Sequence, residues 1–125
     1  MFAAAAVCPH PPLLVPAVAR GAAPELDDLR AACTAAITAM LETEPDAVVC
    51  VGDGPSLARF DESHGGTLRP FGVDVQAGGS GSRDLPLALT VGAWLLDRAA
   101  WSGPRRYFAL PAEMPGPECV ETGKT

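Results

Sequence analysis

Residues 2–16 read Phe-Ala-Ala-Ala-Ala-Val-Cys-Pro-His-Pro-Pro-Leu-Leu-Val-Pro, and the interpretation of the fold starts from this stretch. Its first seven residues are almost all apolar, which predicts a buried strand over residues 2–8. Prolines on both sides of His10 fix the backbone there and favour an extended conformation. Ligands in open α/β sheets bind beyond the carboxyl ends of strands, so a histidine mounted in this way is a candidate functional residue. A purely structural histidine in the proline-rich loop is the alternative.

A helix and a second strand are expected to follow. Acidic residues after Pro24 predict a helix start, and Pro45 predicts its end. Residues 47–51, rich in valine, predict a second buried strand. Strand, helix and strand together predict a βαβ unit with parallel strands. The helix should bury one apolar face and expose a polar one. The apolar face comprises Leu26, Leu29, Cys33, Ile37, Met40 and Leu41, and the polar face Asp28, Arg30, Thr34 and Thr38.

The rest of the chain is richer in turn signals. We expect residues 55–70 to be irregular, residues 71–75 to form a brief strand, and the Gly/Ser-rich residues 78–82 to be a flexible linker. A helix over residues 84–101 and a strand over 107–110 should follow, before a turn-rich tail. The fold class is therefore α/β: residues 1–125 form a single domain with a parallel βαβ core and helices packed on the sheet, or the N-terminal part of a larger three-layer domain. Its open strand edge predicts association with a second copy or with a missing C-terminal half.

Composition limits the classes of partner and compartment. The 125 residues carry a formal net charge of −6, which argues against nucleic acid and against an anionic membrane surface as partners. The four cysteines form no CxxC pair, which favours reduced thiols and a cytoplasmic location. The N-terminal apolar run is too short to cross a bilayer and lacks the cationic start of a signal peptide.

Potential metal ligands gather at the predicted carboxyl ends of the two strands. His10 follows the first strand, Asp53 follows the second, and His64 can reach the same edge from the long loop. A histidine with a carboxylate supplies two of the three ligands in the facial triad that binds non-haem Fe(II). Each residue also has a simpler interpretation: Asp53 as a turn former and His64 as a solvated loop residue. Cys8 and Cys50 are nearby sulfur ligands, or else ordinary core residues.

Three parts of the sequence resemble a known enzyme family. Residues 5–16, the alanine-rich helix and residues 45–53 (Pro-Asp-Ala-Val-Val-Cys-Val-Gly-Asp) resemble the N-terminal half of the class III extradiol ring-cleavage dioxygenases of the LigB-like superfamily, whose relatives include the Memo-like proteins. The resemblance implies Fe(II), molecular oxygen and a catechol-type substrate. It places His10 at the first metal ligand. Asp53 fits the second motif, but Gly54 replaces the ligand histidine there. The family's glutamate ligand and acid–base histidine belong to a C-terminal half.

Two functions follow from this resemblance. The first is an extradiol dioxygenase-like enzyme of aromatic compound catabolism, with His10, Asp53 and His64 as metal ligands, Fe(II) as cofactor and a small aromatic molecule as substrate. The second is a non-catalytic member of the same fold with a degenerate metal site and a binding or structural role. The proline-braced His10 favours the enzyme, whereas Gly54 favours the non-catalytic protein.

Overall fold

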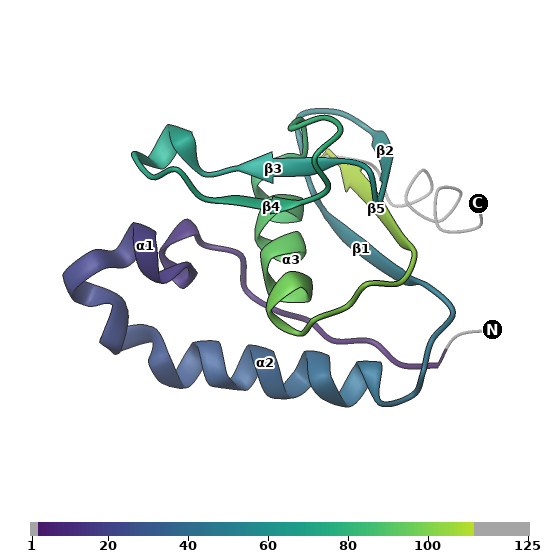
Figure 1. The fold of residues 1–125 in the computed structure, drawn as a ribbon, viewed down its shortest axis with the longest axis horizontal. Coiled ribbons are helices and arrows are strands. Elements are labelled where there is room, and N and C mark those ends of the chain that lie inside the picture. The colour runs from purple at the N-terminus through teal and green to yellow at the C-terminus, as the bar shows by residue number, and fades with distance from the viewer. Residues whose placement is uncertain (1–2, 112–125) are drawn as a thin grey trace.

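The computed structural model describes residues 3–111, and it combines a small mixed sheet with helices and a separate hairpin (Figure 1). The longest helix, α2, runs below the rest of the molecule, and α3 stands at its centre. The elements in chain order are η1 (Pro12–Leu14), α1 (Pro16–Ala19), η2 (Arg20–Leu26), α2 (Asp27–Leu41), β1 (Val48–Asp53), β2 (Ala58–Asp61), β3 (Gly65–Thr67), η3 (Arg69–Phe71), β4 (Gln76–Gly78), α3 (Leu87–Arg98) and β5 (Arg105–Leu110).

The main sheet has the strand order β1-β5-β2. β1 and β5 are parallel, with Val48 opposite Arg105 and Asp53 opposite Leu110. β2 pairs antiparallel with β5 on its other side, so the sheet is mixed. β3 and β4 form a second, two-stranded antiparallel sheet. The α/β class and the C-terminal strand are therefore confirmed, whereas an all-parallel sheet was the wrong expectation.

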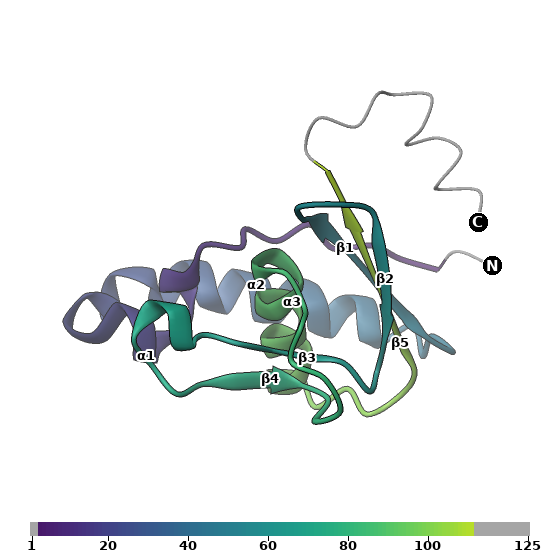
Figure 2. The same ribbon diagram turned by 90° about the horizontal axis from the view of Figure 1, so that it is seen from above.

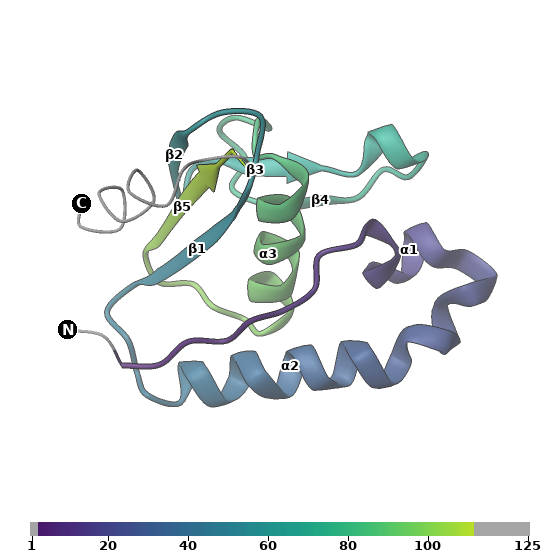
Figure 3. The same cartoon turned by 180° about the vertical axis from the view of Figure 1, so that it is seen from behind.

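The parallel pair is not the predicted one. Residues 3–11 form no strand, so the predicted strand over residues 2–8 is wrong across its described part. The expected βαβ unit is therefore absent from the described residues. The parallel strands are instead β1 and β5, and the connection between them contains α3. This N-terminal segment (residues 3–11) passes α2 and crosses α3 (Figure 3). Exposure alternates along residues 3–8 as in a strand, yet four of these residues are alanine, which has low strand propensity. An apolar run here does not suffice for strand pairing.

The helix α2 follows its predicted pattern only in part. Cys33 and Ile37 are buried as expected, while Leu29 is exposed. Arg30, which the sequence places on the polar face, is also buried. Its Nε donates to the Leu14 carbonyl at 2.8 Å, and its Nη1 bonds to the Asp27 carboxylate at 2.8 Å. The guanidinium thereby ties α2 to the chain that follows the N-terminal segment, a contact that helical periodicity cannot reveal.

The helix α3 is buried on nearly every side. It packs against β1 and β5, against the β3–β4 hairpin and against α2 (Figure 2). The sequence predicts an amphipathic helix at residues 84–101 with one apolar side. The structure instead buries Ala88, Leu89, Thr90, Val91, Ala93, Leu95 and Leu96. A helix surrounded in this way needs apolar residues all round, and Thr90 satisfies its hydroxyl by donating to the Leu85 carbonyl at 3.1 Å.

Residues 58–82 are more regular than expected. The predicted irregular stretch contains β2 and β3, the predicted strand at 71–75 is replaced by η3 and the later β4, and the predicted linker at 78–82 is ordered. The amide of Gly79 donates to the His64 carbonyl at 2.9 Å, and that of Gly81 to the Ser63 carbonyl at 2.9 Å. A Cβ at Gly65 would lie 2.6 Å from the Ala77 carbonyl oxygen. The glycines here permit close packing rather than flexibility.

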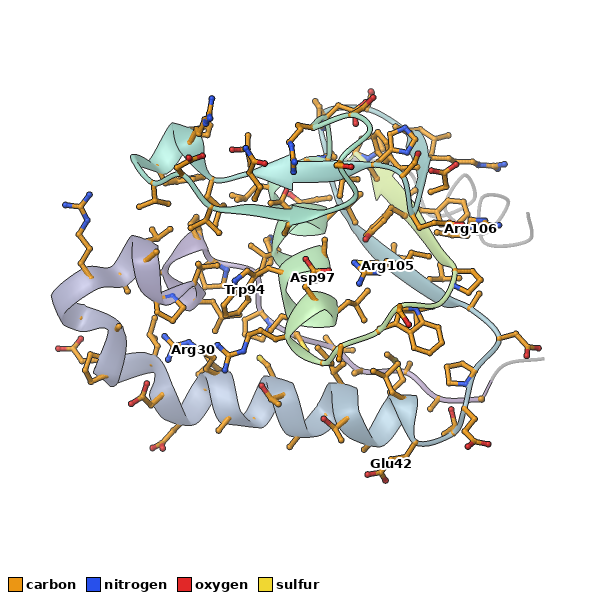
Figure 4. The ribbon with its side chains drawn as sticks, viewed as in Figure 1. Arg30, Glu42, Trp94, Asp97, Arg105 and Arg106 are labelled. Atoms are coloured by element: carbon orange, nitrogen blue, oxygen red, sulfur yellow. The ribbon has the colours of Figure 1, made fainter. Side chains whose placement is uncertain are left out.

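A buried arginine fastens α3 to β5 and β4. Arg105 donates to the Trp101 carbonyl at 2.7 Å and to the Tyr107 hydroxyl at 3.2 Å, and it forms an ion pair with Asp97 at 2.9 Å. Asp97 in turn accepts the Gly78 amide at 2.9 Å. Figure 4 shows the Asp97 carboxylate and the Arg105 guanidinium directed toward each other. One polar network thus holds three elements together.

Within residues 3–111, no helix combines the length and apolar character needed to span a bilayer. The turn-rich tail, including Cys119, lies outside the described residues.

Candidate functional site

The structure brings His10 and Asp53 together, as the sequence predicts. His10 Nε2 lies 3.2 Å from Asp53 Oδ1, and both side chains are about half exposed, at 53% and 58%. Asp53 is fixed as the last residue of β1, opposite Leu110. His10 reaches it from the N-terminal segment, two residues before η1 begins. The juxtaposition therefore arises without the predicted first strand.

A cavity of about 150 Å³ extends from His10 into the core. The N-terminal segment, β1, α2 and α3 enclose it. Most of its walls are apolar, and His10 is the one ionisable nitrogen among the residues that line it. The side chains that matter for its chemistry are Cys8, His10, Ile37, Met40, Cys50 and Val91. A ligand inside would lie against hydrocarbon and sulfur, with His10 as the one lining residue that carries an ionisable nitrogen.

Sulfur atoms are unusually concentrated around this cavity. Cys8 and Cys50 line it, and Cys33 belongs to the buried core on which Cys8 packs. All three are free thiols. Burial raises the pKa of Cys8 to about 11, with a further contribution from Cys33. Burial likewise raises the pKa of Cys50 to about 11. At neutral pH these thiols are protonated and behave as apolar groups until a cation displaces the protons.

The spacing of His10 and Asp53 suits a shared divalent cation. Two ligands at right angles, each about 2.1 Å from a metal, place their donor atoms about 3.0 Å apart. The 3.2 Å between Nε2 and Oδ1 is close to that value. Imidazole nitrogen with carboxylate oxygen is also a donor set that Fe(II) accepts. Residues 3–111 contain no group of three His, Cys, Asp or Glu side chains arranged to hold one metal ion, so the pair alone is a partial site.

Gly54 stands where the resembling family has its second ligand histidine, and its surroundings leave no room for a side chain. A Cβ at Gly54 would lie 2.9 Å from the Ala109 Cβ and 3.2 Å from the Pro86 Cγ. The Gly54 amide donates to the Leu110 carbonyl at 3.0 Å, which fixes the backbone here. A histidine at this position would have to displace its neighbours.

His64 lies away from the His10–Asp53 pair. Its Nδ1 is 3.0 Å from the Asp61 Oδ1, and Asp61 stands opposite Arg106 in the sheet. Asp53 stands opposite Leu110, four residues further along β5, which corresponds to roughly 13 Å. The structure thus does not bring His64 to the predicted edge. The reason is the antiparallel β2, which carries the chain back to the other end of β5.

His64, Asp61 and Ser63 form a local turn cluster rather than a catalytic triad. The amide and hydroxyl of Ser63 both donate to the Asp61 carboxylate, at 2.9 and 2.5 Å. These bonds lower the pKa of Asp61 to about 2, with a smaller contribution from His64. A triad needs its serine and its acid on opposite ring nitrogens, whereas Ser63 and Asp61 both approach Nδ1.

The sequence did not reveal which residues line the cavity. Ile37 and Met40 follow the helical period, which predicts burial but not that they face an open space. It also missed Arg105 and Asp97, because an ion pair between a helix and a strand leaves no short-range pattern.

Comparison of the chain with protein-family models, with curated proteins and with solved structures yields no match.

Proposed function

We propose that this chain is an extradiol dioxygenase-like protein that uses Fe(II) and molecular oxygen to open a catechol-type ring. The observation that carries the proposal is the His10–Asp53 pair, 3.2 Å apart, with His10 lining a mostly apolar cavity. The resemblance of residues 5–16 and 45–53 to the class III family supports the same chemistry, because His10 occupies the position of that family's first ligand.

The cavity has the size of one aromatic ring. Its volume is about 150 Å³, and an apolar cavity of about that volume, engineered in another protein, binds benzene. Ile37, Met40 and Val91 line the cavity and supply hydrocarbon and thioether contacts for a ring. A single-ring catechol would place its hydroxyls toward His10.

The chain's own residues have limited tasks in this scheme. His10 binds the metal through Nε2, and Asp53 supplies an anionic oxygen that offsets part of the metal's charge. The apolar walls hold the ring and exclude water. Fe(II), when bound, supplies the redox chemistry with oxygen that opens the ring. We further propose a cytoplasmic protein, since its three described cysteines are free thiols.

A complete centre requires ligands beyond His10 and Asp53. We propose that they come from a second copy of the chain. β1 is an edge strand of the main sheet, and its outward side chains Val49 and Val51 are 56% and 61% exposed. An exposed apolar edge of this kind favours association with further protein.

The alternative is a non-catalytic member of the same fold that binds a small aromatic molecule without cleaving it. The packing around Gly54 favours it, because Ala109 and Pro86 close the position of the missing ligand. In this case the cavity is retained while the metal site is degenerate.

The test is aerobic incubation of Fe(II)-reconstituted protein with protocatechuate and with catechol, watching for the yellow ring-fission product. We expect colour from the unaltered chain and none from His10→Ala. His64→Gln is the matched control, since His64 lies at the other end of β5, and it should retain activity.

Iron retained after desalting separates the two candidate functions. An enzyme keeps iron and produces colour. Catechol binding by calorimetry, with neither colour nor retained iron, establishes the non-catalytic alternative. If colour, retained iron and catechol binding are all absent, both functions are overturned.

A further inference from the structure

The walls of the cavity beside His10 are almost free of charge. Among the described residues that line it there is no Lys, Arg, Asp or Glu, and no side chain with a hydroxyl or amide group. Ile37 and Met40 line it from α2, and Val91 and Leu95 line it from α3. Such walls favour hydrocarbon, and they leave a buried charge without a partner.

The opening of the cavity is also unfavourable for an anion. His10 lies where the cavity meets solvent, since it lines the cavity while its side chain is 53% exposed. Its charged partner there is the carboxylate of Asp53, with Oδ1 at 3.2 Å from Nε2. An anionic group held at this opening would face that carboxylate, and like charges repel.

A substituent on a bound ring would contact the apolar walls. In the proposed function, on which this inference rests, a catechol directs its two hydroxyls toward His10. The opposite side of the ring then points away from His10, where Ile37, Met40 and Val91 supply the lining. Each additional buried carbon strengthens binding by about fourfold. A carboxylate in the same place would be buried without an ion pair, which is strongly unfavourable.

We propose that the cavity binds catechols without a charged substituent, either unsubstituted or with a small alkyl group, and excludes carboxylated ones such as protocatechuate. Of the two substrates named for the ring-opening test, catechol should therefore give the yellow product and protocatechuate should not. The preference comes from the lining side chains and not from a metal. It therefore holds both for an enzyme and for a protein that binds the ring without cleaving it.

The test is calorimetric titration of the full chain, under argon and without added iron, with four ligands. These are catechol, methylcatechol, protocatechuate and the amide of protocatechuate. The amide matches protocatechuate in size but has no charge, so it separates the effect of charge from that of size. We expect methylcatechol to bind at least as tightly as catechol, and protocatechuate to bind at least about 100-fold more weakly than methylcatechol. The amide should fall between them.

A charge placed in the wall should change this preference. Met40→Lys adds a cation, so it should strengthen protocatechuate binding by at least about 10-fold and weaken methylcatechol binding. Met40→Leu is the matched control, because it nearly conserves the volume of the side chain, and it should keep the order of the unaltered chain. The four ligands on the unaltered chain decide the proposal even where Met40→Lys fails to fold.

Protocatechuate that binds within about 10-fold of methylcatechol would overturn the proposal. Equal exclusion of protocatechuate and its amide would also overturn it, because size would then decide binding. The outcome is distinguishable from failure of the proposed function. Uncharged catechols that bind without colour or retained iron contradict the dioxygenase and support this proposal, whereas colour from protocatechuate supports the dioxygenase and contradicts this proposal.

Discussion

Two regions of this molecule are held in place in different ways. The region around α3, β4 and β5 is fixed by a buried guanidinium, by close glycine packing and by sheet hydrogen bonds. The N-terminal segment has no sheet pairing, and its Val7 side chain is 98% exposed. Yet this segment carries His10 and Cys8, which border the cavity.

The residues that stabilise the fold and the candidate functional residues therefore lie in different parts of the molecule. The residues that fasten the fold lie at the amino-terminal end of β5 and at the carboxyl-terminal end of α3. The candidate ligands lie at the carboxyl end of β1 and on the N-terminal segment, which pairs with no strand. We therefore expect substitutions in the first region to unfold the protein, and substitutions in the second to remove binding while leaving the fold intact.

The largest effect should come from Arg105→Leu. This change leaves the Tyr107 hydroxyl and the Trp101 carbonyl without their buried donor and leaves Asp97 without its cation. We expect a loss of about 4 kcal/mol in the free energy of unfolding, measured by urea denaturation, because each buried polar group left unpaired costs about 1–3 kcal/mol. Arg106→Leu is the control: its ion pair with Glu62 is exposed, so its loss should be below about 1 kcal/mol. Equal losses of unfolding free energy in the two variants would show that the buried Arg105 stabilises the fold no more than the exposed Arg106 does.

Gly65→Ala should come next. The added methyl group would collide with two backbone carbonyl oxygens, that of Ala77, which the β3–β4 pairing fixes, and that of Gly79, whose amide donates to the His64 carbonyl. We expect a loss of about 2–3 kcal/mol on thermal or urea unfolding. Gly21→Ala, where nothing lies within 4 Å, should change stability by less than about 0.5 kcal/mol. A tolerated Gly65→Ala would mean that the hairpin is looser than described.

Asp61→Asn should give a smaller, pH-dependent effect. The folded-state pKa of Asp61, about 2, is below its ordinary value of 3.8, so its stabilisation is present above pH 3.8 and is lost as pH falls toward 2. We expect the variant to melt below the unaltered protein at neutral pH, and the difference in Tm to shrink through this window. A difference that stays constant down to about pH 2 would contradict the assigned pKa.

His10→Ala should have the smallest effect on stability. The side chain is half exposed, and its ion pair with Asp53 is open to solvent. We expect a change below about 0.5 kcal/mol in urea denaturation. A loss as large as that expected for Gly65→Ala would show that His10 is a structural residue. The N-terminal segment would then stabilise the fold as the region around α3 does.

The sequence predicts some of these elements well and others poorly. Apolar periodicity locates α2 and α3, and β-branched residues locate β1, because each pattern reflects burial of one element. The failures lie where partners distant in the chain decide the outcome. Residues 3–8 look apolar enough for a strand, but the structure leaves them unpaired, and the buried Arg30 depends on carbonyls of another segment.

The candidate site likewise has features that the sequence predicts and features that it does not. The approach of His10 to Asp53 agrees with the prediction, but the predicted reason is wrong, because residues 3–11 form no strand. The separation of His64 from that pair was not predictable, because it depends on the antiparallel pairing of β2 with β5. The volume and lining of the cavity likewise depend on how α2 and α3 pack, which no single segment encodes.

The most direct measurement uses the fact that the chain contains only two histidines. Nitrogen-15 NMR of histidine-labelled protein, titrated with paramagnetic Mn(II) as a substitute for Fe(II), reports on each imidazole separately, and His64→Gln assigns the signals. Joint metal binding by His10 and Asp53 predicts selective broadening of the His10 signals that Asp53→Asn abolishes, with His64 unaffected. Equal broadening of both rings, or broadening of His10 that survives Asp53→Asn, would contradict it.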